Sequence, residues 1–313
     1  MLVALAWCVM ASCAPKANIK GRVLADGTAL AGVLVSDGEQ IVTTDSKGRY
    51  AIRSSKKDSV VFVITPSGYV CSSQDGLRPS FWAKVDAPAE KVEKHDFFLK
   101  KEDQSFYTAI LTADMHLSKD PRRDDLSRFS DIVLPVIDSI TNAASLKGPV
   151  YTMNLGDITH DVYWYEMGFT GENAVEYLKE VGYPTLMYAV SGNHDNDGAI
   201  VGENVDERAA WQYRKLWGPS HYSMNIGSDH WVMLDDIIYI NTEGQGKKAP
   251  GIKGAREYEE ALRPDQLEWL ARDLSFVPDS ARVIICMHCP MLASLKKDLF
   301  KLPQEQIAYV DSL

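Results

Sequence analysis

The chain has 313 residues, 45% of them hydrophobic, and its 33 Lys and Arg against 43 Asp and Glu give a formal net charge of -10. This length allows one large core or two moderate ones, and the composition is ordinary for a globular protein. The acidic balance argues against binding along a nucleic-acid backbone, so no nucleic-acid partner is expected. It does not exclude a small phosphate substrate, because metal ions can supply local positive charge.

The first segment, residues 1–16, is predicted to be a leader. Met1 to Met10 is almost wholly apolar and gives way to Ala11-Ser12-Cys13. The apolar run is shorter than the roughly 20 residues that span a bilayer. It resembles a bacterial lipoprotein signal, which implies a lipid anchor at Cys13 and a place in the cell envelope, in the periplasm or at the outer membrane. No Lys or Arg precedes the run, so a plain buried segment remains the alternative.

Residues 17–101 are predicted to form a small all-β sandwich. Apolar, β-branched stretches such as Val33–Ser36, Ile41–Thr44 and Val60–Ile64 are separated by turn residues. Turns recur at intervals of about ten residues, as in sandwich folds. The stretch from Thr44 to Tyr50 resembles the transthyretin-like, carboxypeptidase-regulatory type of domain, where it marks a hairpin and not a catalytic site. We therefore expect a structural or interaction role for this part.

Residues 102–313 are predicted to form an α/β layered domain, because strand and helix patterns alternate after the charged segment Lys100-Lys101-Glu102-Asp103. The expected strands are 106–111 (a buried one), 150–155, 186–190, 222–226 and 231–234. The expected helices are 131–144, 172–181 and 264–274. In the first helix the apolar residues recur at helical spacing and are expected on one face: Ile132, Val133, Val136, Ile137 and Ile140.

Four of the apolar stretches end in polar residues that are able to bind metal. The polar ends are Asp114-Met115-His116, Gly156-Asp157, Asn193-His194-Asp195 and Met287-His288. Because sites in open α/β sheets form at the carboxyl ends of strands, we expect these ends to converge. The two side chains of Asp-x-His leave one side of an extended backbone, and a carboxylate can bridge two cations. Oxygen and imidazole ligands suit manganese, iron or zinc better than calcium.

In their order and spacing these four segments resemble the first four blocks of the calcineurin-like metallophosphoesterases. The resemblance runs from about Phe106 to His288 and includes the flanking stretches 213–219 and 265–270. It implies a layered α/β/β/α domain and a phosphoester hydrolase in which a hydroxide bridged between two divalent metals attacks phosphorus. The implied substrate is a small-molecule phosphoester, with phosphodiesters slightly preferred over monoesters.

The same resemblance implies two divalent metal ions, manganese, iron or zinc, and a set of ligands for them. Asp114 and His116 would hold the first metal, Asp157 would bridge both metals, and Asn193 and His288 would hold the second. Each of these five residues stands at a position of the family's motif.

The resemblance also implies two residues that act beside the metals. His194 would face the substrate and protonate or stabilise the leaving oxygen, and Asp195 would orient His194. Asp157 would contribute to catalysis through the metals that it bridges.

One departure from the family pattern concerns its fifth block, Gly-His-x-His, whose histidines complete both metals. None of the seven histidines follows His288, and the sequence ends at Leu313. We interpret the domain as incomplete at the C-terminus and expect the chain to bind metals weakly and to have little activity. A natural variant with substitute ligands, for which His221 and His230 are the candidates, is the alternative.

Two further groups of residues are weaker candidates for substrate contacts, and other functions remain open. His160 and Asp161 could reach the cleft, and Arg122 and Arg123 could clamp a phosphate. The alternative for each pair is a position in a solvated surface loop without a functional role. The chain could also be a non-catalytic remnant whose β-sandwich binds a partner or glycan, or a metal-binding structural lipoprotein. The oligomeric state is left open.

Overall fold

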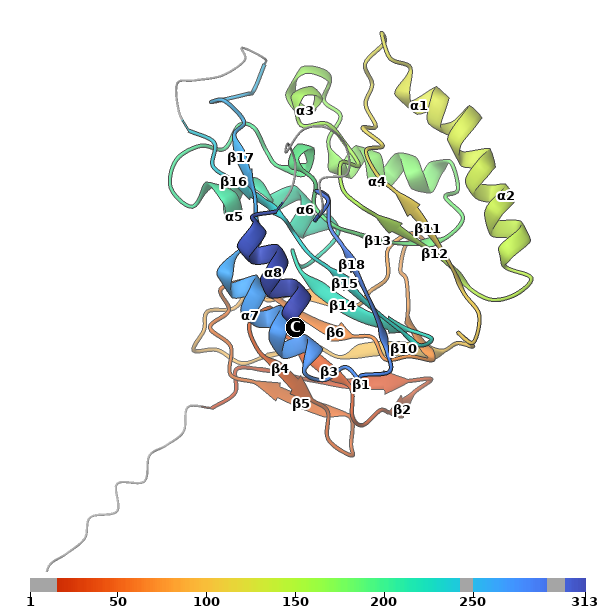
Figure 1. Cartoon of the computed structure of the whole chain (residues 1–313), viewed down its shortest axis with the longest axis vertical. Coiled ribbons are helices and arrows are strands. Elements are labelled where there is room, and N and C mark those ends of the chain that lie inside the picture. Colours follow the sequence, from red (N-terminus) through yellow and green to blue (C-terminus); the bar gives the residue numbers. More distant parts are fainter. Residues whose placement is uncertain (1–15, 243–249, 292–301) are drawn as a thin grey trace, which may run out of the picture.

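The computed structural model describes residues 16–242, 250–291 and 302–313 (Figure 1). Residues 1–15, which include the expected anchor Cys13, lie outside the described residues. Across the part of the chain that is described, no helix combines the length and the apolar character needed to cross a bilayer.

The N-terminal part of the chain consists of ten short strands in two sheets, drawn in red to orange in Figure 1. In the six-stranded sheet, β1 is the central strand: it pairs with β2, β5, β9 and β10, and β7 pairs with β10. The four-stranded sheet has the order β4-β3-β6-β8. The strands are β1 (Ile19–Ala25), β2 (Thr28–Ala29), β3 (Leu34–Ser36), β4 (Ile41–Thr43), β5 (Arg49–Ile52), β6 (Val60–Ile64), β7 (Tyr69–Cys71), β8 (Trp82–Lys84), β9 (Glu93–Lys94) and β10 (Phe97–Lys101).

A three-stranded parallel sheet carries the first three metal-binding segments. Its order is β11 (Thr108–Thr112), β12 (Val150–Asn154) and β13 (Leu186–Ala189). Alternate residues of a strand face opposite sides of the sheet, as the pleat requires. Met187 of β13 packs with the helices, and Tyr188 packs with the second sheet. The helices between the strands are α1 (Asp125–Arg128), α2 (Leu134–Ala144), α3 (Val162–Met167) and α4 (Gly171–Glu180).

The second sheet carries the fourth segment and has the order β14 (Tyr222–Ile226), β15 (Asp229–Met233) and β18 (Arg282–Cys286). Strands β16 (Ile237–Tyr239) and β17 (Tyr258–Glu260) pair separately. On the outer side of this sheet lie α7 (Pro264–Leu274) and α8 (Gln304–Ser312), whose apolar residues join the same core (Figure 1). The short helices α5 (Val205–Ala209) and α6 (Trp211–Leu216) precede β14. The order helix, sheet, sheet, helix confirms the expected α/β layered class.

The N-terminal sheets share their core with the layered part. Phe62 of β6 packs against Trp269 of α7 with ring centroids 6.1 Å apart, and the Trp269 indole N–H donates to Ser36 Oγ at 3.0 Å. The backbone N–H of Asn225 donates to Thr65 O at 2.8 Å, so the end of β6 lies beside β14. Unfolding of the N-terminal strands would therefore expose part of the core beneath the second sheet.

The apolar face of the first predicted helix is largely exposed, and the expectation that the strand at 106–111 is buried is wrong. The predicted helix forms as a π-helical turn at Phe129–Val133 followed by α2, but Ile132 and Val136 are 60% and 56% exposed. Leu134 and Ile137 face the sheet, so Ile137 is the one buried residue of the five expected on one face. Leu134 lies two positions from Ile132 and from Val136, and residues two positions apart on a helix point to nearly opposite sides. Strand β11 is an edge strand of its sheet, so the segment expected to be buried exposes Leu111 by 59%.

Candidate metal centre

Parallel pairing of β11 and β12 continues beyond both strands and sets the first two metal-binding segments side by side. The N–H of Asp114 donates to Gly156 O at 3.1 Å, and the N–H of His116 donates to Asp157 O at 2.9 Å. The two segments thus leave the sheet in a fixed register. This explains why residues far apart in sequence meet at one edge.

Three of the expected ligands have backbone conformations that non-glycine residues rarely adopt. Asp114, His116 and Asp157 have φ values of 52°, 44° and 56°. Such left-handed residues cost free energy, on the order of 1 kcal/mol each, and concentrate at functional sites. Here they turn the chain at the strand ends.

The first three residues expected as ligands converge. The ligand atoms of Asp114, His116 and Asp157 all lie within 4.8 Å of one another. His116 Nε2 is 3.6 Å from Asp114 Oδ1 and 3.7 Å from Asp157 Oδ2. Two carboxylates and one imidazole around a common point form a donor set suited to a divalent transition metal.

Asp157 also belongs to a second group of ligands. Its Oδ2 lies 3.5 Å from His288 Nε2, and the same nitrogen lies 3.0 Å from Asn193 Oδ1. Asn193 begins the short 3-10 helix Asn193–Asp195 that follows β13. The Asp157 oxygen therefore stands between His116 and His288. All five residues expected as metal ligands meet at this centre.

The hydrogen bonding of His288 fits a cation at this second group. His288 Nδ1 lies 2.8 Å from Leu155 O, so a proton on Nδ1 is donated to a carbonyl, as in many metal-binding histidines. In that tautomer Nε2 carries a lone pair that faces the oxygens of Asn193 and Asp157. A cation placed among these three atoms would relieve the repulsion of their lone pairs.

Electrostatics at the centre also favour bound cations. Burial raises the pKa of Asp157, and the charge of Asp114 adds to this rise although the N–H of His194 opposes it. Burial, with the positive charge of any protonated His194 or His160, lowers the pKa of His116 to about 4. The imidazole is thus neutral at physiological pH, which is the form that binds metal.

Glycine is required at two positions where backbones pass close together. A Cβ on Gly192 would lie 2.1 Å from Asp157 Oδ1, and one on Gly156, where φ is +96°, would lie 2.7 Å from His288 Nδ1. Both contacts are far below a van der Waals distance. The two glycines therefore allow the Asp157 and His288 side chains to reach the centre.

His194 lies beside the metal ligands, but a different carboxylate orients it. Asp161 Oδ1 lies 2.9 Å from His194 Nδ1. The carboxylate of Asp195 instead accepts the N–H of Asp157 at 2.8 Å and that of Gly192 at 2.9 Å. The expectation that Asp195 orients His194 is therefore wrong, because the Asp195 Oδ2 atom is taken by backbone amides. Asp195 shapes the loop that holds Asp157.

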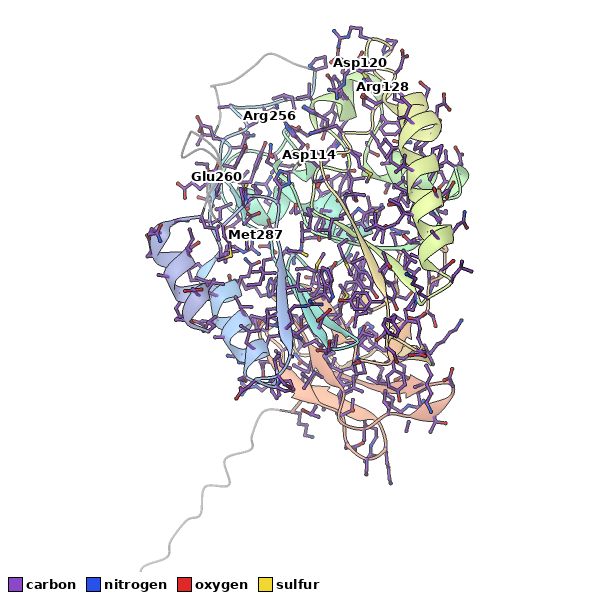
Figure 2. All side chains as sticks on the ribbon, turned by 45° about the vertical axis from the view of Figure 1, so that its right-hand side comes forward. Asp114, Asp120, Arg128, Arg256, Glu260 and Met287 are labelled. Carbon is purple, nitrogen blue, oxygen red and sulfur yellow. The ribbon has the colours of Figure 1, made fainter. Side chains whose placement is uncertain are left out.

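Arg256 is a site residue that the sequence analysis missed. Its guanidinium pairs with Asp161 and approaches His194 Nδ1 to 2.7 Å. Because one ring nitrogen cannot both donate to Asp161 and accept from Arg256, we take Nδ1 as a donor to the carboxylate that Arg256 also binds. Arg256 lies outside every motif, and only its left-handed φ of 57°, held by Asn241, marks it. Figure 2 shows Arg256 and Asp114 at the same end of the molecule.

His160 also joins this cluster, and Asp161 is held ionised within it. The His160 ring stacks on His194 with centroids 3.8 Å apart, and the ligand atoms of His116, His160 and His194 lie within 4.8 Å of one another. Burial alone would raise the pKa of Asp161, but hydrogen bonds from His160 and His194 and the charge of Arg256 lower it to about 2.

The remaining candidates have partners elsewhere. Arg122 pairs with Asp120 at 2.8 Å, and Arg123 pairs with Asp125 at 3.2 Å. His221 Nε2 lies 2.9 Å from a carbonyl oxygen of the N-terminal part, and His230 Nε2 lies 2.8 Å from a buried carboxylate of α7. Neither histidine is among the metal-binding groups found in the described residues.

Comparisons with known proteins find matches for parts of the chain. Residues 17–102 match the family model described as the N terminal of Calcineurin-like phosphoesterase. The serine/threonine-protein phosphatase CPPED1 of Pongo abelii is 28% identical over 130 residues, which are 41% of this chain and 35% of that protein. The chain thus spans about one third of the length of this curated relative.

Two solved structures are similar to the chain at low identity. A dimetal phosphatase from Danio rerio is 15% identical with a TM-score of 0.39, over 65% of this chain and 76% of that one. The purple acid phosphatase PPD1 from yellow lupin (Lupinus luteus) seeds is 11% identical with a TM-score of 0.35, over 84% of this chain and 47% of that one.

Proposed function

We propose that the chain is a metal-dependent phosphoester hydrolase whose reaction takes place at the Asp157 centre. One observation carries the proposal: Asp157 Oδ2 lies 3.7 Å from His116 Nε2 and 3.5 Å from His288 Nε2. A carboxylate close to one imidazole from each ligand group can bridge two cations, which a two-metal site needs. The match of residues 17–102 to the N-terminal part of calcineurin-like phosphoesterases and the named activity of the curated relative support the same reading.

Two divalent cations are proposed as cofactors. Asp114, His116 and Asp157 would hold one, and Asp157, Asn193 and His288 would hold the other. The mixture of oxygen and imidazole donors favours manganese, iron or zinc. When bound, such cations make water more acidic and neutralise charge on phosphoryl oxygens.

The side chains around the cations would bind and orient the substrate. His194 would donate a proton from Nε2 to the leaving oxygen. Asp161, which receives the Nδ1 hydrogen, holds the ring in place and stabilises its protonated form, against the burial that lowers the pKa of His194. The Arg256 guanidinium, paired with Asp161, adds positive charge where phosphoryl oxygens would lie.

The proposal also concerns the substrate class, a phosphodiester or a phosphomonoester. The resemblance of the four motifs favours phosphodiesters slightly over monoesters. The name of the curated relative, a serine/threonine-protein phosphatase, favours a phosphomonoester on a protein as the second candidate. Rates with an aryl phosphodiester and an aryl phosphomonoester decide between the two.

The testing experiment is hydrolysis of bis(p-nitrophenyl) phosphate and p-nitrophenyl phosphate with added manganese. Asp157→Asn should lose nearly all activity, and His194→Ala most of it, while the exposed control Asp279→Asn keeps it. A reduction of roughly 100-fold or more is expected for the removal of one acid catalyst. Equal rates in the wild type and both site variants, or no hydrolysis of either ester, would contradict the proposal.

We also propose, from the leader residues alone, that the protein is anchored in the cell envelope through a lipid on Cys13. Metabolic labelling with a tagged fatty acid should mark the wild type and not Cys13→Ser. Equal labelling of the two, or none in the wild type, would contradict the anchor.

A further inference from the structure

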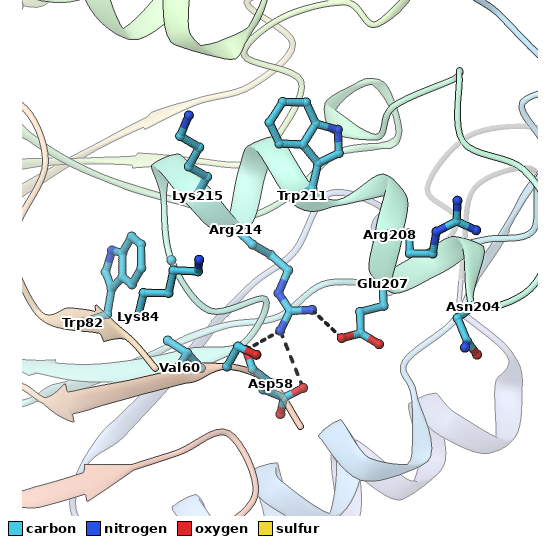
Figure 3. Close-up of a pocket in the computed structure, with 12 residues that line it drawn as sticks. Asp58, Val60, Trp82, Lys84, Asn204, Glu207, Arg208, Trp211, Arg214 and Lys215 are labelled. Atoms are coloured by element: carbon cyan, nitrogen blue, oxygen red, sulfur yellow. Dashed lines mark hydrogen bonds and ion pairs between the residues drawn. The ribbon is translucent and has the colours of Figure 1, made fainter. Parts of the chain in front are cut away.

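A cavity lies away from the metal centre, between the N-terminal sheets and the helices α5 and α6 (Figure 3). Its volume is about 630 Å³, within the range of small-molecule sites. None of the metal-centre residues lines it. One wall comes from the segment of β6 and β8, and the other from residues 204–218. The place between two packed parts of a chain is one where ligand sites often occur.

Two tryptophans line the cavity, and both are held in place. Trp82 lies against Gly218, where a Cβ would be only 2.6 Å from its ring and where φ is +103°. The indole N–H of Trp211 donates to Asp197 Oδ2 at 2.8 Å. Trp211 nevertheless remains 42% exposed. Fixed, accessible indole rings present flat faces to a ligand at little entropic cost.

The polar groups of the cavity carry a positive excess. Arg214 is fixed by Glu207 at 3.5 Å and by Asp58 at 3.8 Å (Figure 3). Lys84 and Lys215 also line the cavity, and each pairs with a carboxylate that does not. Exposed lysine pairs of this kind contribute little, so both ammonium groups can turn towards an anion.

We propose that this cavity binds a pyranose sugar that carries one anionic group. The indole faces suit the C–H faces of a sugar ring, and the carboxylate of Glu207 and the amide of Asn204 suit its hydroxyl groups. The two lysines suit a carboxylate or a phosphate on the ring. The sugar class follows from the combination in one cavity of flat aromatic faces, hydroxyl acceptors and exposed lysines that can turn towards an anion.

Isothermal titration calorimetry of the whole chain with glucuronate, glucose 6-phosphate and glucose, each up to about 10 mM, tests the proposal. At least one anionic sugar should bind at least about tenfold more tightly than glucose. Comparing the carboxylate with the phosphate shows which anion the lysines prefer. The metal-centre variant Asp157→Asn should bind with unchanged affinity, which separates this site from the proposed hydrolase.

The variants test the cavity itself. Lys84→Ala with Lys215→Ala should weaken binding of the anionic sugar at least about tenfold. The surface pair Lys147→Ala with Lys179→Ala should not change it, and thermal unfolding checks that all variants are folded. Trp211→Ala should weaken the binding of every sugar that binds. The proposal is overturned if no anionic sugar binds, if glucose binds equally well, or if the cavity lysines make no difference.

Discussion

The carboxylate of Asp161 lies 2.9 Å from Nδ1 of His194, which stands 33 residues further along the chain. The neighbour of His194 in the motif, Asp195, binds backbone amides instead. Two aspartates at the centre therefore have different tasks, and only Asp195 belongs to the motif. Asp161 positions an imidazole, and Asp195 positions the loop that carries Asp157.

Asp161→Asn should lower kcat by on the order of tenfold to a hundredfold with a smaller change in KM, because an amide no longer stabilises protonated His194. The pH profile of kcat should change as well, since His194 loses the carboxylate that raises its pKa. Asp195→Asn should instead lower the thermal unfolding temperature. An Asp161→Asn enzyme with wild-type kcat at every pH would contradict the positioning role.

Arg256→Ala should raise KM for a phosphoester and weaken inhibition by inorganic phosphate by roughly tenfold, the loss of one charge-assisted hydrogen bond. Arg256→Lys should recover part of that loss, because an ammonium keeps the charge but not the two-pronged contact. The exposed Arg128, labelled in Figure 2, offers a matched control. If Arg128→Ala and Arg256→Ala behave alike, Arg256 does not contact the phosphoryl group.

Gly192→Ala should disrupt the centre, because its Cβ would lie 2.1 Å from Asp157 Oδ1. We expect a loss of about 1–3 kcal/mol of unfolding free energy from overpacking, together with weaker manganese binding. Gly202→Ala is the comparison, since a Cβ there meets no atom within 4 Å, although its φ of +90° adds backbone strain. Urea unfolding and manganese titration measure the two effects. Undiminished manganese affinity in Gly192→Ala would show that Asp157 does not need its present position.

His221 should make the stability of the fold depend on pH. Burial, with the charge of Arg263, lowers the pKa of His221 to about 4 although the Gly38 carbonyl opposes this, against about 6.5 when unfolded. The unfolded chain then binds a proton that the folded chain does not, so this stability is complete above pH 6.5 and falls as the pH drops towards 4. We expect a loss of about 2 kcal/mol between pH 7.5 and pH 5.

The measurement is urea unfolding of the wild type and His221→Gln at both pH values. Other buried carboxyls titrate in this range, so the difference between the two proteins is the quantity that matters. His221→Gln should lose less stability on acidification by about 2 kcal/mol. If both proteins respond equally to pH, the His221 ring is accessible to protons in the folded state.

Sequence patterns predicted the bounds of several helices and strands to within a few residues. The helix expected at 264–274 is α7 with the same bounds, and the paired strands 222–226 and 231–234 are β14 and β15 within a few residues. Those patterns are local, since Pro264 begins a helix and alternation marks a strand. Burial was not predictable in the same way. The apolar stripe of α2 with Ile132 looks like a core face, and only the packing of α2 on its sheet shows that Ile137 is buried while Ile132 and Val136 are exposed.

The sequence predicted the site residues that lie in motifs at strand ends, and it did not predict the others. Asp114, Asp157 and His288 follow apolar runs, and the rule that strand ends share one edge brings them together. Arg256 reaches His194 from a segment with no periodic pattern. The choice of Asp161 over Asp195 depends on which carboxylate the backbone amides occupy, a tertiary detail that adjacency in sequence does not reveal.

The central claim is that Asp157 joins two groups of metal ligands. Equilibrium dialysis against saturating manganese, followed by metal analysis, tests it most directly on the wild type, Asp157→Asn and the exposed control Asp279→Asn. At saturating manganese the account predicts two manganese ions per chain in the wild type and in the control, and loss of both in Asp157→Asn. Retention of the wild-type manganese content by Asp157→Asn would contradict the account.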